Sequence, residues 1–174
     1  MNETITTLIK RRSIRNYNDK AVEKEKLEEI LLAGTYAPTA SGKQSPTIVA
    51  IENKDDLKAL EKINAEIMGN LNANPFYSAK VAILVLGDST NNNTIYDGSL
   101  VIGNLMNAAA SLGLGSCWIH RAKETFERED GKAFLKKWGL TGNYIGIGYV
   151  VLGYTNDAVL ADGPARKNNY VYHI

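Results

Sequence analysis

The stretch from Asp97 to Leu112 constrains the fold of this chain more than any other. Apolar side chains cover nearly every side of the helix that it is expected to form: Leu100, Val101, Ile102, Leu105, Met106, Ala108, Ala109, Ala110 and Leu112. A helix that is apolar all round has to be buried on all sides. In a chain of 174 residues, such a helix lies either at the centre of the fold or in a subunit interface.

The rest of the pattern predicts a mixture of helices and strands. Val81 to Gly87 is an uninterrupted apolar run, typical of a strand that is buried on both faces. Because two helices precede the first strand, an α+β fold is favoured over a doubly wound sheet. No repeat or linker indicates a second domain, so we expect one domain over residues 1–174. Helices are expected over 3–12, 23–36, 55–67, 97–112 and about 125–138, and strands over 47–52, 81–87, 116–119 and 144–153.

Composition excludes several classes of partner. Lys and Arg total 20 against 19 Asp and Glu, so there is no bulk charge to attract nucleic acid or a membrane surface. A single cysteine excludes an intramolecular disulfide and favours a reducing compartment. The first residues are polar and do not resemble a signal peptide, and no apolar run approaches the roughly 18 residues of a membrane helix. We therefore expect a cytoplasmic protein.

Three arginines and a serine are concentrated in the segment Arg11-Arg12-Ser13-Ile14-Arg15. The guanidinium group donates in a fork that matches phosphate oxygens, and so dense a cluster repels itself unless an anion binds to it. A second basic pair, Arg166-Lys167, lies in the C-terminal tail. If the tail folds back, the two clusters could hold one phosphate between them. The alternative is a solvated helix end whose charges suit the helix dipole.

Spacing argues against other kinds of chemistry. His120, His173 and Cys117 do not have the spacing of metal ligands. The run from Gly113 to Trp118 begins like a dinucleotide fingerprint, but it has tryptophan in place of the third glycine and lies between a helix and a strand. No phosphate loop and no Ser-His-acid arrangement is present. Anion-binding residues without an acid, base, nucleophile or metal of their own indicate a protein that uses a phosphorylated cofactor.

Five segments, in their order and spacing, resemble the FMN-dependent nitroreductase family in its short, single-domain form. The first is the arginine segment at 11–15, and the last is Gly153-Tyr154 followed by Arg166-Lys167. Between them lie Ala37-Pro38-Thr39-Ala40-Ser41-Gly42-Lys43-Gln44, Phe76-Tyr77-Ser78-Ala79-Lys80 and Leu112-Gly113-Leu114-Gly115-Ser116-Cys117-Trp118-Ile119. In this context the phosphate-binding interpretation of the arginines is favoured over the solvated helix end.

The resemblance implies an α+β nitroreductase-like fold, with a central mixed β-sheet flanked by helices. It implies a domain-intertwined homodimer with FMN at the interface and a C-terminal arm, about residues 160–174, that packs on the partner subunit. Flavin N5 carries the chemistry, so no side chain is implied to be catalytic and no metal is implied. The residues implied to bind FMN are Arg11, Arg12, Ser13, Arg15, Pro38, Thr39, Ala40, Ser41, Gln44, Trp118, Ile119, His120, Arg121, Arg166 and Lys167.

The resemblance also assigns roles to these residues. The arginine segment would bind the phosphate and ribitol, and Arg166 and Lys167 would complete the phosphate site. The loop at 38–41 would lie against the flavin ring of the other subunit, with Gln44 bonded to the ribitol or the ring edge. The segment 116–121 would follow the ring. A helix stop with a turn is the alternative for Pro38-Thr39.

The chain departs from the family after Ile119. Many members continue with a small or acidic residue and glycine, whereas this chain has His120-Arg121. A histidine there could bias the flavin potential or the charge preference for substrates, or it could simply be a partly exposed side chain after a strand. The asparagine that contacts flavin in longer members has no secure counterpart, and Asn72 and Asn74 are the candidates.

The resemblance implies an enzyme that uses NADH or NADPH to reduce nitroaromatic or quinone-type acceptors by a ping-pong hydride mechanism. A relative with a dedicated reaction, such as flavin destruction or reductive dehalogenation, is a second possibility. A redox-quiet FMN storage or sensing protein would share the phosphate contacts, and an anion-binding module without flavin is a further alternative. The sequence does not choose between NADH and NADPH, although Lys43 or Arg121 could meet a 2′-phosphate.

Overall fold

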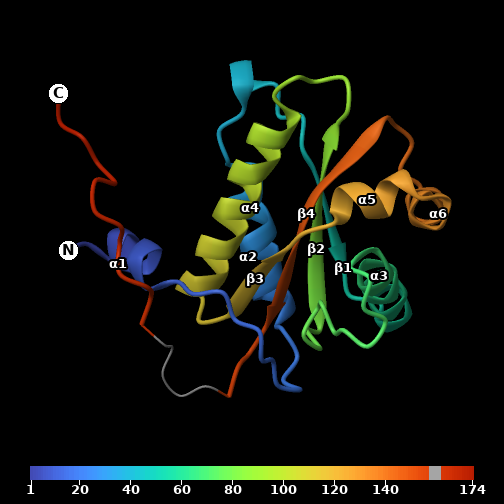
Figure 1. Ribbon diagram of the computed structural model, residues 1–174, viewed down its shortest axis with the longest axis horizontal. Helices are drawn as coiled ribbons and strands as arrows, with labels where there is room; N and C mark the ends of the chain where they lie inside the picture. Colours follow the sequence, from blue (N-terminus) through green and yellow to red (C-terminus); the bar gives the residue numbers. More distant parts are fainter. Residues whose placement is uncertain (157–161) are drawn as a thin grey trace.

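The fold consists of one β-sheet with helices on both faces (Figure 1). The computed structural model describes residues 1–156 and 162–174. The strands β1 (Thr47–Ile51), β2 (Val81–Asp88), β3 (Gly115–Ile119) and β4 (Tyr144–Gly153) lie in the order β1-β2-β4-β3. The helices are α1 (Glu3–Lys10), α2 (Lys24–Thr35), α3 (Lys54–Ile67), α4 (Thr94–Ser111), α5 (Ala122–Glu127) and α6 (Glu129–Lys137), with a short 3-10 helix η1 (Ala40–Gly42). The predicted α+β class is confirmed.

The sheet is antiparallel at each of its three strand pairings, β1 with β2, β2 with β4, and β3 with β4. The mixed character expected from the sequence is confined to a parallel bridge between Ser13 and Ser116. That bridge lies outside the named strands and places the arginine segment beside β3, beyond the edge of the four-stranded sheet.

β2 divides the core into two layers, because successive side chains of a strand point to opposite faces. Val81, Ile83 and Val85 pack with α2 and α4 on one face. Ala82, Leu84 and Leu86 pack with α3, α5 and α6 on the other. All of these side chains are buried, which confirms the predicted strand with two buried faces. Figure 1 shows the two groups of helices on opposite sides of the sheet.

α4 is buried on the side that faces the sheet but not all round. Val101, Ile102 and Leu105 are buried against α2 and the sheet. Leu100, by contrast, is 48% exposed, and Ile95 and Tyr96 in the first turn are also exposed. The apolar helix was expected either at the centre of the fold or in a subunit interface. Packing within this chain buries only one face of α4.

Predicted helix boundaries were wrong at three places, one of them the helix expected over 97–112, which begins earlier, at Thr94. The helix expected over 3–12 ends at Lys10, because Arg11 takes up an extended conformation (φ −53°, ψ 135°). The chain then runs beside β3, where the Ile14 N–H donates to the Ser116 carbonyl at 2.9 Å. A backbone pairing with a distant strand, absent from the local pattern, therefore ends this helix.

The single helix expected over about 125–138 is two helices, α5 and α6. The break lies at Arg128, whose extended backbone (φ −79°, ψ 151°) separates them. Gly131 in α6 lies so close to α5 that a Cβ there would overlap the Thr125 carbonyl. A glycine is therefore required where the two helices meet.

Tyr154 anchors the chain where it leaves β4. Its hydroxyl donates to Glu23 at 2.6 Å and accepts from the Lys26 ammonium at 2.8 Å, while the Lys20 ammonium lies 3.8 Å from the ring centroid. The hydrogen bond from Tyr154, together with the nearby Lys20, holds the pKa of Glu23 at about 2. These contacts fix the origin of the C-terminal tail relative to α2.

Within the described part of the chain, no helix has both the length and the apolar character that a membrane span requires. The same residues contain no group of three or more His, Cys, Asp or Glu side chains that could hold a metal ion.

Candidate functional site

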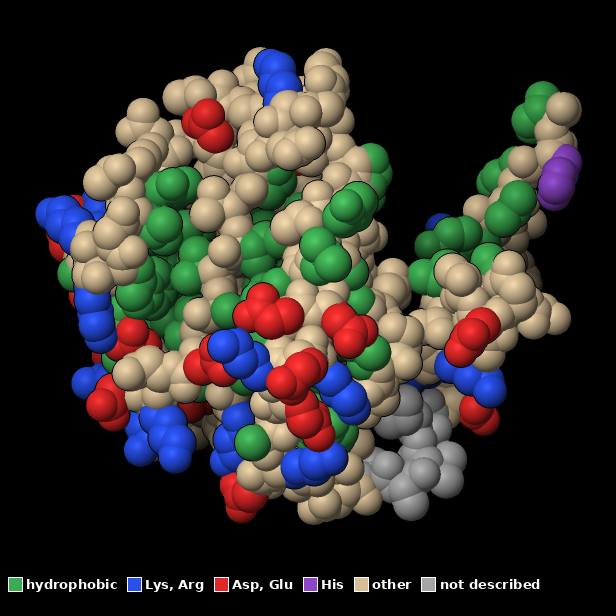
Figure 2. All heavy atoms as spheres, turned by 180° about the vertical axis from the view of Figure 1, so that it is seen from behind, with side chains coloured by type: hydrophobic (Ala, Val, Ile, Leu, Met, Phe, Trp, Pro, Cys, Tyr) green, Lys and Arg blue, Asp and Glu red, His purple; other side chains and the backbone are tan. Residues whose placement is uncertain are grey.

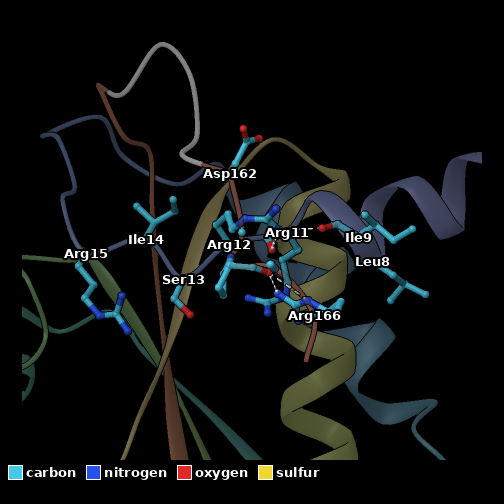
Figure 3. A pocket seen from close by; sticks show the side chains of 12 residues that line it. Leu8, Ile9, Arg11, Arg12, Ser13, Ile14, Arg15, Asp162 and Arg166 are labelled. Carbon is cyan, nitrogen blue, oxygen red and sulfur yellow. Dashed lines mark hydrogen bonds between the residues drawn. The ribbon is translucent and has the colours of Figure 1, made fainter. Parts of the chain in front are cut away.

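The arginine segment and the C-terminal tail line one cavity of about 990 Å³. The tail returns to the N-terminal part of the chain, and the Arg12 guanidinium packs against Gly163. Figure 3 shows Arg11, Arg12 and Arg166 gathered at one side of this cavity and Arg15 at the other. The lining residues are Leu8, Ile9, Arg11, Arg12, Ser13, Ile14, Arg15, Asp162, Gly163, Pro164, Ala165 and Arg166. The expected meeting of the two basic clusters thus holds for Arg166.

The cavity has a strongly positive lining. Four arginines contribute to it, and Asp162 is the one carboxylate among the described lining residues. The Arg11 Nη1 atom is buried and has no hydrogen-bond partner within residues 1–156 and 162–174. Burial of an unpaired guanidinium nitrogen is costly, and an anion in the cavity would remove that cost. The Ser13 side chain is exposed on the same segment and offers a hydroxyl donor.

Lys167 does not line this cavity. Its ammonium lies 5.1 Å from the centroid of the Tyr170 ring, farther along the tail. Arg166 itself bonds to the Pro164 carbonyl, which holds its guanidinium close to the tail backbone. The two neighbouring basic residues, which sequence reasoning placed together, are therefore separated by the structure. Residues 160 and 161 of the predicted C-terminal arm lie outside the described residues.

A second cavity, of about 340 Å³, lies at the end of β3. Arg15 lines both cavities, so basic side chains continue from one to the other along the edge of β3. Burial raises the pKa of the Cys117 thiol, which keeps it neutral near pH 7. The predicted group 118–121 is brought together here. The lining residues are Arg15, Met68, Ala73, Asn74, Pro75, Tyr77, Cys117, Trp118, Ile119, His120 and Arg121.

The two asparagines considered as flavin contacts, Asn72 and Asn74, differ in their position relative to this cavity. Asn74 is among its lining residues and Asn72 is not. Asn74 bonds to Ser78 through both its amide nitrogen and its carbonyl oxygen, at 2.8 and 3.2 Å, and so holds a tight turn. Tyr77 and Ser78 in that turn have positive φ angles of 54° and 60°. Such strained backbone is common at functional sites.

The loop at 38–44 does not join either cavity. It lies against the first turn of α4, where the Ala40 N–H donates to Asp97 at 2.9 Å. Pro38, Ser41 and Gln44 are exposed, whereas Thr39 and Ala40 are partly buried. The Gln44 N–H donates to the Thr39 hydroxyl at 3.0 Å. The Gln44 backbone is left-handed, with a φ of 49°.

This loop and the arginine segment lie at opposite ends of α4. The loop is bonded to Asp97 in the first turn, whereas Arg11 and Arg12 share a pocket with Ala110 in the last turn and with Gly113 just beyond it. An α-helix rises about 1.5 Å per residue, so the separation is roughly 20 Å. One chain therefore does not bring all the predicted residues around a single site.

Comparisons with known proteins identify the family of this chain. The nitroreductase family model matches residues 8–154. The chain belongs to the nitroreductase family. A protein of Archaeoglobus fulgidus with the provisional name NADH dehydrogenase/NAD(P)H nitroreductase is 31% identical over 163 residues, which cover 90% of this chain and 88% of that one.

Solved structures agree with this membership. A Bacteroides fragilis nitroreductase with bound FMN has a TM-score of 0.92 and 27% identity, with all of both chains covered. An FMN-dependent nitroreductase of Clostridium difficile has a TM-score of 0.79 and 28% identity, with 98% of each chain covered. The nitroreductase-like fold that the sequence predicted is confirmed.

Asp97 and Asn64 are polar residues of this chain that sequence reasoning did not select. Asp97 is 3% exposed and bonds to the Ala40 N–H, with Ser45 and Asn91 near its other oxygen. Asn64 is fully buried and donates to the His120 carbonyl at 2.8 Å. Their signal in the sequence is a polar residue within an apolar helical face, which does not by itself identify a partner.

We predict that Asp97→Ala lowers the free energy of unfolding by about 2 kcal/mol, because a buried acceptor for Ala40 and Ser45 is removed. Urea denaturation measures this difference. Asp55→Ala is the control, since Asp55 is an exposed residue in the first turn of α3 and should change stability by no more than about 0.5 kcal/mol. Equal effects of the two substitutions would contradict the role assigned to Asp97.

Proposed function

We propose that this chain is an FMN-dependent oxidoreductase that uses NADH or NADPH to reduce nitroaromatic or quinone-type acceptors by a ping-pong mechanism. The observation that carries the proposal is the arginine-rich cavity formed where the tail returns to residues 11–15. Membership of the nitroreductase family, and the bound FMN of a relative with a TM-score of 0.92, support FMN as the group it takes.

The residues present fit a flavin phosphate. The buried, unpartnered Nη1 atom of Arg11 supplies a donor, and Arg12 and Arg166 add positive charge to the same cavity. Guanidinium groups bind phosphate through paired donors. In the proposed complex Ser13 donates to the phosphate or ribitol, and Arg15 lies between the phosphate and the second cavity. Lys167 has no part in this arrangement.

The flavin would accept hydride from the nicotinamide and pass electrons to the acceptor. The residues of the chain would bind the flavin and orient it. In the proposed complex the segment from Trp118 to Arg121, at the end of β3, lies beside the ring, with Ile119 as its buried support. Arg15, at the border of the two cavities, places a fixed cation beside the ring edge. In the proposed complex Asn74, which lines the second cavity, contacts the flavin, whereas Asn72, which does not line it, has no such role.

We also propose that two copies of the chain complete each site. The loop at 38–41 lies roughly 20 Å from its own chain's arginine segment by the helix rise, so it serves the flavin bound to the other copy. Asp97 holds that loop in place from α4. The single domain over residues 1–174 then contributes one half to each of two sites.

Exposed apolar surface supports this dimer. On α1, Ile5, Leu8 and Ile9 share one face, yet no residue of that helix is buried. Leu100 on α4 is a separate exposed apolar side chain, toward the end of that helix opposite to Ala110, which shares a pocket with α1. Figure 2 shows the tail projecting from the body with hydrophobic side chains along it. Exposed apolar side chains gathered on one helix face, as on α1, are typical of an interaction site.

The proposed function is tested by anaerobic titration of the purified protein with NADH and with NADPH, with flavin absorbance as the readout. We expect the yellow colour to bleach and to return when a quinone or nitroaromatic is added. A yellow protein that never bleaches would instead indicate FMN storage or sensing. A colourless protein that cannot be reconstituted with FMN would contradict the proposal.

Arg166 and Lys167 allow a matched test of the phosphate site. Arg166→Ala should weaken FMN binding about tenfold, because a charge-assisted hydrogen bond of roughly 1.5 kcal/mol is lost. Lys167→Ala should leave the affinity within about twofold, since that ammonium lies over Tyr170 and not in the cavity. Fluorescence titration of the apoprotein with FMN measures both. Equal losses would place the phosphate elsewhere.

The dimer is tested with two leucines. Leu100→Glu should give a monomer that releases FMN, because it places a charge in the proposed interface. Leu71→Glu is the control: Leu71 is 74% exposed, in the turn after α3, and its substitution should leave the assembly intact. Sedimentation equilibrium distinguishes a monomer of 19.1 kDa from a dimer of twice that mass. A dimeric Leu100→Glu variant that keeps its FMN would contradict this interface.

A further inference from the structure

The cavity at the end of β3 is lined by cationic side chains without a compensating carboxylate among the described residues. Arg15, His120 and Arg121 line it, and none of the described lining residues carries a carboxylate. Arg15 has an assigned role beside the flavin in the proposed function. Arg121 belongs to the segment proposed to lie beside the ring, but its side chain has no role there, and it lies where family members were expected to have glycine. The question is what a cation does at this position.

The backbone of Arg121 is held in a costly conformation. Its φ of 73° and ψ of 14° are left-handed, which is unfavourable for a residue with a Cβ. The Arg121 carbonyl accepts from the Thr125 N–H at 2.9 Å and from the Thr125 hydroxyl at 2.7 Å. These bonds at the start of α5 fix the direction in which the side chain leaves the chain.

Asn64 contacts the side chain of Arg121. This fully buried residue donates to the His120 carbonyl at 2.8 Å, and its own carbonyl oxygen lies 3.4 Å from Arg121 Nη1. The contact is long and involves one nitrogen, so the remaining guanidinium donors stay available. None of the ion pairs among residues 1–156 and 162–174 includes Arg121.

The surroundings suit a flat, conjugated molecule. The Trp118 and His120 rings stack with centroids 5.6 Å apart at 30°. Tyr77, from the turn with positive φ angles after α3, also lines the cavity. A guanidinium at the end of an aromatic-walled cavity binds a planar anion both by charge and by its paired donors.

We propose that Arg121 is a specificity-determining residue that binds an anionic group carried by one of the enzyme's two substrates. The group is a carboxylate on an aromatic acceptor or the 2′-phosphate of NADPH. Asn64 acts as its positioning residue. The assignment to a substrate rests on the proposed reductase function, whereas the anion site itself does not.

The test is calorimetric, so it does not depend on turnover. Each purified protein is titrated with 4-nitrobenzoate and with the neutral 4-nitrobenzamide, and separately with NADP⁺ and NAD⁺, which differ in the same 2′-phosphate and cannot reduce the flavin. We compare the wild type, Arg121→Gln and Arg121→Lys. For each pair, the dissociation constant of the member without the extra anionic group is divided by that of the member with it. This ratio measures the preference for the anionic member.

We expect one of the two ratios to fall about tenfold in Arg121→Gln and to be largely retained in Arg121→Lys. Loss in the nitrobenzoate pair assigns the group to the acceptor, and loss in the NADP⁺ pair assigns it to the nicotinamide donor. Lys123→Gln is the control, because Lys123 pairs with Glu127 at 3.7 Å and does not line the cavity. Its ratios should match those of the wild type.

Three results would overturn the proposal: a wild type without preference for either anionic partner, ratios unchanged in Arg121→Gln, or an equal loss in Lys123→Gln. Failure of the reductase function has a different signature. A protein that never bleaches with nicotinamide, but still loses its nitrobenzoate preference in Arg121→Gln, retains the anion site and lacks the proposed chemistry.

Discussion

The pairing of the arginine segment with the edge of β3 is the constraint on which the rest of the site depends. The Ile14 N–H donates to the Ser116 carbonyl, and Gly115 permits the approach, since a Cβ there would lie 2.9 Å from Ile14. This one contact ends α1 and aligns Arg11 and Arg15 along a strand. It also gives both cavities a common wall. Mutually repelling cations are thereby held in a fixed line, ready for an anion.

The features that could be predicted from the sequence are those that depend on the local residue pattern. The alternation in β2 follows from the pleat, so its two buried faces could be inferred from Val81 to Gly87 alone. The nitroreductase motifs identified the family and placed Arg11, Arg12 and Arg166 in one site. The resemblance did not separate Arg166 from Lys167, because neighbours in an irregular tail can point in any direction.

What sequence reasoning missed depends on contacts between distant residues. The break between α5 and α6 requires Gly131 against Thr125, whereas the periodicity of that stretch reads as one helix. The role of Asp97 depends on a loop more than 50 residues away in the chain, which bonds to it through Ala40. The left-handed backbone of Arg121 is stabilised by Thr125, with Asn64 bonded to the neighbouring His120 carbonyl. None of these partners is marked in the residue pattern.

The incomplete burial of α4 links the fold to the proposed chemistry. A helix with apolar residues on every side, but one exposed face, has a driving force for association that grows with the area it buries. The same helix carries the loop of 38–44 at its first turn and borders the arginine segment at its last. Antiparallel packing of two copies along α4 would bring the loop of one chain toward the arginines of the other. Association would then assemble the cofactor site, so that loss of the interface and loss of FMN occur together.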